Sequence, residues 1–220
     1  MSRSALRVPV KKRTASKVER QLQLIRATIR SVAKNGLSDT TMATVAKEAG
    51  LSQGIINLHF KSKERLLDET LRYIADEYRS VWEKALAETG PSPAERLTVL
   101  VEVDFKLPVC DRNKLAVWFA FWGESKSRPR YRKLCATRDI QYRRELGAIC
   151  EQLIEEGGYE DLDPMVLATG LSAMTEGLWL DLLISPRSMT REQARDICFA
   201  YLASAFPRHF SNPWPLEIKS

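Results

Sequence analysis

The chain has 220 residues, of which 44% are hydrophobic and 28% charged, and its formal net charge at pH 7 is +6. This length allows one or two domains with a substantial core. The longest apolar run, Leu115 to Trp122, is too short to span a bilayer, and the N-terminus lacks the apolar region of a secretory signal, so neither feature indicates a membrane or exported protein.

The residue types that carry catalysis or bind metals are sparse. The four cysteines, Cys110, Cys135, Cys150 and Cys198, have no metal-type spacing and are interpreted as reduced thiols of a cytoplasmic protein. His59 and His209 are the two histidines, and no glycine-rich phosphate loop, GxSxG, HExxH or CxxC motif is present. We therefore expect no enzyme, no cofactor and no metal site.

The N-terminal segment is strongly basic. Nine cationic residues and one anionic residue, Glu19, lie within residues 1–30. Residues 1–17 show no helical periodicity and are predicted to form a flexible arm. Such an arm attracts phosphate groups; a merely solubilising or artificial tail is the alternative.

The first predicted helix begins at Val18. Its apolar residues recur every three or four positions to Val32, and Asn35-Gly36 closes it. Residues 41–60 follow as two short helices. Thr40 or Thr41 is the expected cap of the first of these helices, Gly50 the left-handed turn residue, and Ser52 the cap of the second. This pattern predicts a helix-turn-helix.

The second of these helices carries polar residues that its packing does not need. Gln53 and Asn57 have the paired donors and acceptors that suit base edges, and Ile55 suits a thymine methyl. Gly54 permits close backbone approach, while His59 and Lys63 suit phosphates. An ordinary helical hairpin with a solvated outer face is the alternative.

The remainder of the chain keeps the helical period. Helices are predicted for residues 62–88, 94–106, 115–126, 129–156, 163–184 and 190–206. Thr190 and Gln193 have the spacing of a capping box. The sequence predicts an all-α protein of about nine helices, with no convincing strand pattern and no internal repeat.

From Ala49 to Leu66 the chain resembles the TetR/AcrR family of bacterial repressors, whose pattern there is A-G-V-S-x-G-x-x-Y-x-H-F-x-x-K-x-x-L. The resemblance implies a homodimer with a helix-turn-helix head and a helical ligand-binding body. It places the DNA contacts on Thr41, Thr44, Gln53, Gly54, Ile55, Asn57, His59 and Lys63. The family's tyrosine is replaced here by Asn57, which favours a base contact over the usual aromatic phosphate contact.

Residues 115–134 and 175–186 resemble the choline-responsive, BetI-type branch of that family. An inducer such as choline, from the glycine betaine pathway, suits aromatic faces and a carboxylate. The expected ligand-binding residues are Trp118, Phe121, Trp122, Glu176 and Trp179, with Asp104 and Glu124 as further carboxylate candidates. Simple core packing of these aromatic residues is the alternative.

The predicted organisation follows from these segments. Residues 1–17 form the arm, 18–78 the DNA-binding domain, 79–210 the ligand-binding and dimerisation domain, and 211–220 a tail. The small residues Gly170, Ala173 and Gly177 favour close approach of another helix. We expect a homodimer seam of helices 163–184 and 190–206, although packing within one chain also fits.

The predicted function is a cytoplasmic transcriptional repressor, nucleoid-associated when bound to a near-palindromic operator and relieved by a small-molecule inducer. Two half-sites about 34–36 Å apart match the two recognition helices of a dimer. A regulator that responds to a different hydrophobic or aromatic inducer is the main alternative. A helical interaction module that does not bind DNA is a remote one.

Overall fold

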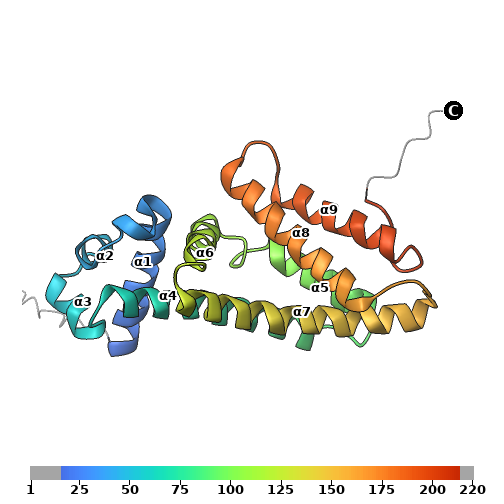
Figure 1. Cartoon of the computed structure of the whole chain (residues 1–220), viewed down its shortest axis with the longest axis horizontal. Helices are drawn as coiled ribbons and strands as arrows, with labels where there is room; N and C mark the ends of the chain where they lie inside the picture. The colour runs from blue at the N-terminus through green and yellow to red at the C-terminus, as the bar shows by residue number, and fades with distance from the viewer. Residues whose placement is uncertain (1–15, 214–220) are drawn as a thin grey trace, which may run out of the picture.

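A computed structural model describes residues 16–213, apart from the side chains of residues 137–139, and these residues contain α-helices and no strand. Nine helices follow one another along this part of the chain (Figure 1): α1 Lys17–Asp39, α2 Met42–Ala49, α3 Gln53–His59, α4 Lys63–Ala87, α5 Pro93–Phe105, α6 Arg112–Glu124, α7 Pro129–Gly157, α8 Pro164–Ile184 and α9 Arg191–Ala205. The all-α prediction and the expected number of helices are confirmed. The predicted flexible arm up to Ala15 and the tail from residue 214 lie outside the described residues.

Several helix boundaries agree with the local sequence signals. Thr190 and Gln193 form the predicted capping box of α9, and Ser62 accepts a hydrogen bond from the Arg65 N–H at the start of α4. Gly36 has a φ of 78° and interrupts α1 where Asn35-Gly36 was expected to end the helix. Local capping and glycine conformation therefore set these boundaries.

One helix start and one cap differ from the prediction. Helix α6 begins at Arg112 instead of Leu115, because the Asp111 carboxylate accepts from the Asn113 and Lys114 N–H groups, both at 3.1 Å. Ser52 lies at the cap position of α3, but its side chain makes no capping hydrogen bond. Its backbone carbonyl instead accepts from the Ile55 N–H at 3.0 Å.

The helices enclose two hydrophobic cores that meet along α4. Helices α1 to α3 bury residues such as Leu24, Val45 and Ile56 against Leu71 of α4. The other core contains the far half of α4 together with α5, α7, α8 and α9. Ile74 belongs to the first core and Tyr78 to the second, so α4 connects the head to the body (Figure 1).

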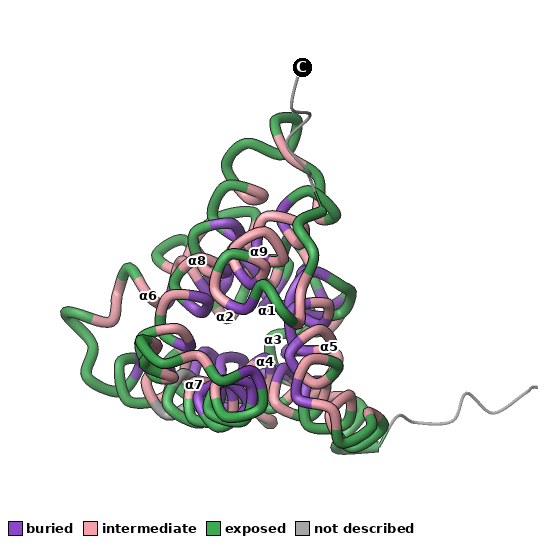
Figure 2. Tube along the Cα trace, turned by 90° about the vertical axis from the view of Figure 1, so that its right-hand side faces the viewer, coloured by how far each residue is buried: buried purple, intermediate pink, exposed green. Residues whose placement is uncertain are grey.

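Helix α6 and the first half of α7 lie at the junction of head and body. Val117, Trp118 and Phe121 of α6 are buried in the same core as the head helices, and Tyr131 and Cys135 of α7 join them. In the end-on view of Figure 2, the buried stretches of the body helices face inward and the exposed stretches lie outside. The head is therefore packed on the body and does not hang from a free linker.

Helix α8 is strongly apolar, although much of its surface is exposed to solvent. Among the described residues it is the one helix long and apolar enough to cross a membrane, but a soluble protein's core helix can have the same length and composition. Only 33% of its most apolar window is buried within this chain. Val166 and Ile184 are 68% and 64% exposed. This exposed apolar face is the type of surface that a partner covers.

The four cysteines are buried, and burial is the main cause of a raised thiol pKa at three of them. Burial raises the pKa of Cys110 to about 11 and that of Cys150 and Cys198 to about 12. Only the thiolate reacts readily with alkylating reagents. At pH 8 we therefore expect these three thiols to be alkylated at least about 100-fold more slowly in the folded protein than in denaturant. Mass spectrometry after timed iodoacetamide treatment measures this ratio, and rapid labelling of all three in the folded protein would contradict it.

Candidate functional site

The turn between α2 and α3 is fixed by backbone hydrogen bonds. Gly50 has a φ of 65° and donates its N–H to the carbonyls of Ala46 and Lys47. The Leu51 N–H also donates to the Ala46 carbonyl, at 2.9 Å. A left-handed glycine ends α2 sharply, so the chain turns into α3 within three residues, as the sequence predicted.

Helix α3 buries one face and exposes another. Ile56 is fully buried, and Phe60 directly after the helix is almost so. Ala46 of α2 is also buried, and its small side chain lets the two helices lie close together. Because this apolar face holds α3 against the head, the opposite face is presented to solvent.

The exposed face of α3 holds most of the residues predicted to read DNA. Gln53, Gly54 and Asn57 are exposed, while Ile55 is half-buried. Leu58, to which the sequence analysis assigned no DNA contact, is 79% exposed. The structure therefore brings the amide side chains and one apolar side chain without a predicted contact onto a single surface at the outer end of the head.

Three of the other predicted contacts, Thr41, Thr44 and Lys63, have hydrogen-bond partners within the head. The Thr41 and Thr44 side chains form a capping box at the start of α2. Lys63 Nζ donates to the Ser38 carbonyl at 3.0 Å, and His59 is half-buried. The His59 Nδ1 atom is buried with no hydrogen-bond partner among residues 16–213. The side chains of Thr41, Thr44 and Lys63 are thus held by contacts within the head, whereas the Nδ1 atom of His59 is not.

The structure separates the five predicted ligand-binding residues. Trp118 and Phe121 are buried in the head-side core, and Trp122 lies against Trp118 with ring centroids 5.9 Å apart. Trp179 is buried in the body core, and Glu176 is half-buried on α8. The predicted set is therefore divided between the two cores, with Trp122 packed against both of them at the head–body junction.

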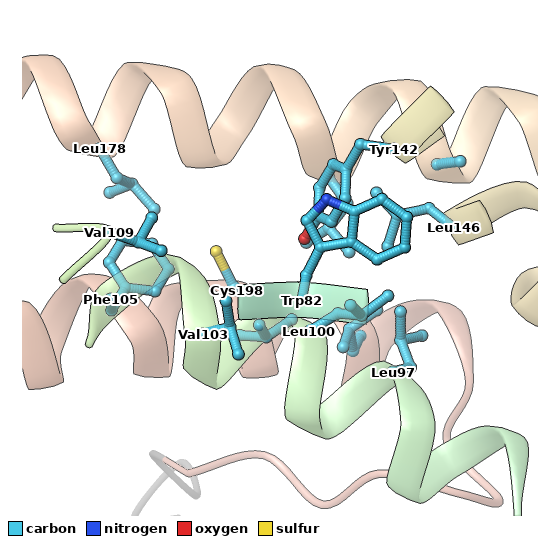
Figure 3. Close-up of a cluster of buried hydrophobic side chains, with 14 of the residues drawn as sticks. Trp82, Leu97, Leu100, Val103, Phe105, Val109, Tyr142, Leu146, Leu178 and Cys198 are labelled. Carbon is cyan, nitrogen blue, oxygen red and sulfur yellow. The ribbon is translucent and has the colours of Figure 1, made fainter. Parts of the chain in front are cut away.

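A different cluster in the body combines a carboxylate with aromatic rings. Asp104 on α5 is 2% exposed, and its two carboxylate oxygens accept from the Tyr78 hydroxyl at 2.7 Å and the Tyr142 hydroxyl at 2.8 Å. Trp179 Nε1 donates to the Asp104 backbone carbonyl at 2.8 Å. Trp82 lies beside Tyr142, with ring centroids 5.8 Å apart (Figure 3). We call these five residues the Asp104 cluster.

The electrostatics of the Asp104 cluster are those of a buried anion among aromatic rings. Burial first, and then the charge of Asp104, raise the pKa of Tyr142 well above its usual value, so its hydroxyl remains a proton donor. A buried carboxylate is costly unless it is hydrogen-bonded or paired with a cation. Aromatic faces attract quaternary ammonium groups. Carboxylate and rings together provide the chemistry that recognises a small organic cation.

The sequence analysis identified Asp104 and Trp179 as candidates but missed Tyr78, Trp82 and Tyr142. Tyr78 and Trp82 lie one turn apart on α4, where their spacing predicted only an apolar helix face. Tyr142 lies on α7, with its hydroxyl directed at the same carboxylate. The local signal for these rings was their helical spacing, which does not distinguish core packing from a ligand site.

A groove of about 400 Å³ lies between α4 and α7 beside this cluster. Trp82 lines the groove and also contacts Tyr142 of the cluster. The other residues that line the groove include Arg72, Arg79, Arg130 and Lys133. Trp82 therefore connects the Asp104 cluster to an opening on the surface of the body.

Both halves of the chain match known protein families. Residues 24–70 match the model for bacterial regulatory proteins of the tetR family, and residues 93–207 match the C-terminal domain of BetI-type transcriptional repressors. Over 187 residues the chain is 32% identical to the HTH-type transcriptional regulator BetI of Stenotrophomonas maltophilia, covering 83% of this chain and 91% of that protein. It is 28% identical to BetI 1 of Chromohalobacter salexigens, covering 88% and 93% of the two chains.

Solved structures show the same fold. A Saccharomonospora viridis protein described as a transcriptional regulator, crystallised in complex with choline, aligns with a TM-score of 0.76 and 26% identity, covering 84% of this chain and 96% of that chain. A regulator of the same description from Pseudomonas aeruginosa PAO1 aligns with a TM-score of 0.77 and 28% identity over 90% and 96% of the two chains.

Proposed function

The chain belongs to the tetR family of bacterial regulatory proteins and has a BetI-type C-terminal domain, and we propose that it represses transcription until a small quaternary amine such as choline releases it from its operator. Regulators of this family bind operator DNA, dimerise and bind small-molecule ligands, and they are not enzymes. The proposal adds the inducer class, the contacts and the dimer geometry.

The exposed face of α3 supports the DNA-binding part of the proposal. Gln53 and Asn57 present amide groups that suit adenine edges in the major groove. Thr44, His59 and Lys63 are half-buried, so each keeps part of its polar side chain accessible, and in this proposal they contact the flanking phosphates. Each subunit thus inserts α3 into one half-site of a near-palindromic operator in the cytoplasm, where the bound protein is nucleoid-associated.

The exposed apolar face of α8 supports dimerisation through α8 and α9. Met165, Val166, Leu180 and Ile184 are exposed on α8. A Cβ at Gly170 would lie 2.8 Å from the Tyr201 hydroxyl of α9, so this glycine permits packing within one chain. A Cβ at Gly177 would have no neighbour within 4 Å, so Gly177 remains accessible to a second copy. The two glycines therefore have different roles.

The Asp104 cluster is the single observation that carries the inducer assignment. Its carboxylate is buried, and it is held by the hydroxyls of two tyrosines beside two tryptophans. A quaternary ammonium has no N–H to donate, so charge and aromatic faces are the means of recognising it. The choline-bound Saccharomonospora viridis regulator supports this choice of ligand class.

Helix α4 provides a route from the ligand to the DNA. Tyr78 and Trp82 contribute to the Asp104 cluster, while Leu71 and Ile74, about one or two turns earlier, are buried in the head-side core. Glu77 is paired with Lys114 of α6, and Asp68 with Arg130 of α7. A ligand that separates Tyr78 from Asp104 would move α4 and change the spacing of the two heads, provided it prefers that arrangement.

A gel-shift experiment tests the DNA-binding proposal. We expect the protein to retard DNA from upstream of its own gene as a complex of two chains per operator, and to leave unrelated DNA of equal length unbound at the same salt concentration. Equal retardation of both DNAs would contradict sequence-specific binding, and retardation of neither DNA would favour the interaction-module alternative.

A thermal-shift screen tests the inducer class. Choline and betaine aldehyde are expected to raise the melting temperature, because a ligand that binds the folded state stabilises it. Aromatic and acyl compounds serve as the comparison. Stabilisation by those compounds and by no quaternary amine would replace choline with the alternative inducer class.

A further inference from the structure

Leu58 is the most exposed large hydrophobic residue that the structure reports in the head. It is 79% exposed, compared with 63% for Val18, and it lies on α3 among polar neighbours. An isolated exposed leucine needs no explanation on most surfaces. This one lies on the face that the proposed function directs at the major groove, where an exposed apolar side chain can meet an apolar group of a base.

Gly54 has no side chain that could cover Leu58 on the outer face of α3. Helical side chains lean toward the N-terminus, so Leu58 projects over the turn that contains Gly54, four residues earlier. A Cβ at Gly54 would meet only Ser52 Oγ, at 3.8 Å. Packing within this chain therefore does not require glycine there. Together Gly54 and Leu58 form an apolar patch with close backbone access.

Ile55, the residue predicted to contact a thymine methyl, is less accessible than Leu58. It is half-buried, whereas Leu58 on the next turn is directed at solvent. An apolar side chain makes no hydrogen bond to a phosphate or to a base edge. In the major groove, the apolar group that a base pair offers is the C5-methyl of thymine.

We propose that Leu58 contacts a thymine C5-methyl in each half-site and is a specificity-determining residue of the recognition helix. This inference rests on the proposed function, because it needs α3 in the major groove. It adds a base preference at one position, and that preference depends on the methyl group alone.

Replacing thymine by uracil tests the inference, because uracil removes the methyl and keeps the base pairing and the hydrogen-bonding groups. Once the operator is identified, uracil is placed at one symmetric pair of thymines at a time, and affinities are measured by fluorescence anisotropy at constant salt. Burial of one methyl corresponds to a loss of about fourfold per half-site and about 15-fold for both. We expect this loss at one thymine pair for the wild type.

L58A and L58M are the matched variants. L58A should bind the thymine operator more weakly than wild type and be insensitive to uracil at that pair, whereas L58M, which keeps an apolar contact, should retain part of the sensitivity. If wild type binds equally at every uracil position, or L58A keeps the full uracil effect, the inference is wrong while the proposed function stands. Absence of any specific DNA binding by the wild type would overturn both.

Discussion

A D104N protein is expected to lose its response to choline while keeping its affinity for the operator. The substitution removes the buried negative charge and keeps the size of the side chain. Asp104 accepts from the hydroxyls of both Tyr78 and Tyr142, whereas the single amide oxygen of Asn accepts from one of them. Leaving one partner of a buried charge pair unmatched costs about 3–5 kcal/mol, roughly two to three and a half orders of magnitude in affinity. Isothermal titration calorimetry with choline measures the loss.

Two further variants show whether the loss of choline binding comes from the charge of Asp104 or from a change in folding. E102Q removes a carboxylate from the same helix, where Glu102 is paired with Lys106 at the surface, and it should leave choline binding unchanged. Y142F keeps the Asp104 charge and removes one hydrogen bond to it, so its effect should be smaller than that of D104N. Choline binding by D104N with wild-type affinity would contradict the assignment of the Asp104 cluster.

A Q53A protein is expected to lose most of its discrimination between operator and random DNA. Gln53 is exposed at the start of α3, and a bidentate amide contact to adenine contributes about 1–3 kcal/mol of discrimination. Each dimer makes the contact twice, so the expected loss is about 2–6 kcal/mol, which corresponds to roughly 30-fold to 10⁴-fold in the affinity ratio. Competition anisotropy with operator and random duplexes measures this ratio.

Q152A is the matched control for Q53A, because Gln152 is an exposed glutamine on α7 in the body. It should leave operator and random-DNA affinities unchanged. The non-specific affinity of Q53A should also stay near that of wild type, because phosphate contacts dominate that quantity. Unchanged discrimination in Q53A would mean that another residue reads the base at this position.

The head could be predicted from the sequence because its determinants are local. Gly50 adopts the left-handed conformation at the turn, and Thr41 caps α2 within three residues of its partner Thr44. Ile56 and Phe60 lie four residues apart and are both buried. Caps, turn glycines and helical spacing act over a few residues, so a linear reading of the sequence finds them.

The Asp104 cluster could not be predicted because its members come together only in the tertiary structure. Tyr78, Asp104, Tyr142 and Trp179 belong to four different helices. Helical spacing says that each lies on an apolar face, but it does not say which faces meet. The same limit explains why Trp118 and Trp179, grouped as one ligand set, lie in separate cores.

The sequence pattern also did not show which apolar side chains of one helix are exposed and which are buried. Leu58 and Ile55 are both apolar and lie on the same short helix, yet Leu58 is exposed and Ile55 is half-buried. The rotation of α3 against α2 decides between them. That rotation is set by the packing of Ile56 and Phe60 in three dimensions.

Titration of a preformed operator complex with choline tests the central claim most directly. Fluorescence anisotropy of labelled operator DNA, at constant salt and protein concentration, should fall to the value of free DNA as choline saturates the wild type. It should remain at the bound value for D104N. An operator complex of the wild-type protein that choline leaves intact would contradict the account.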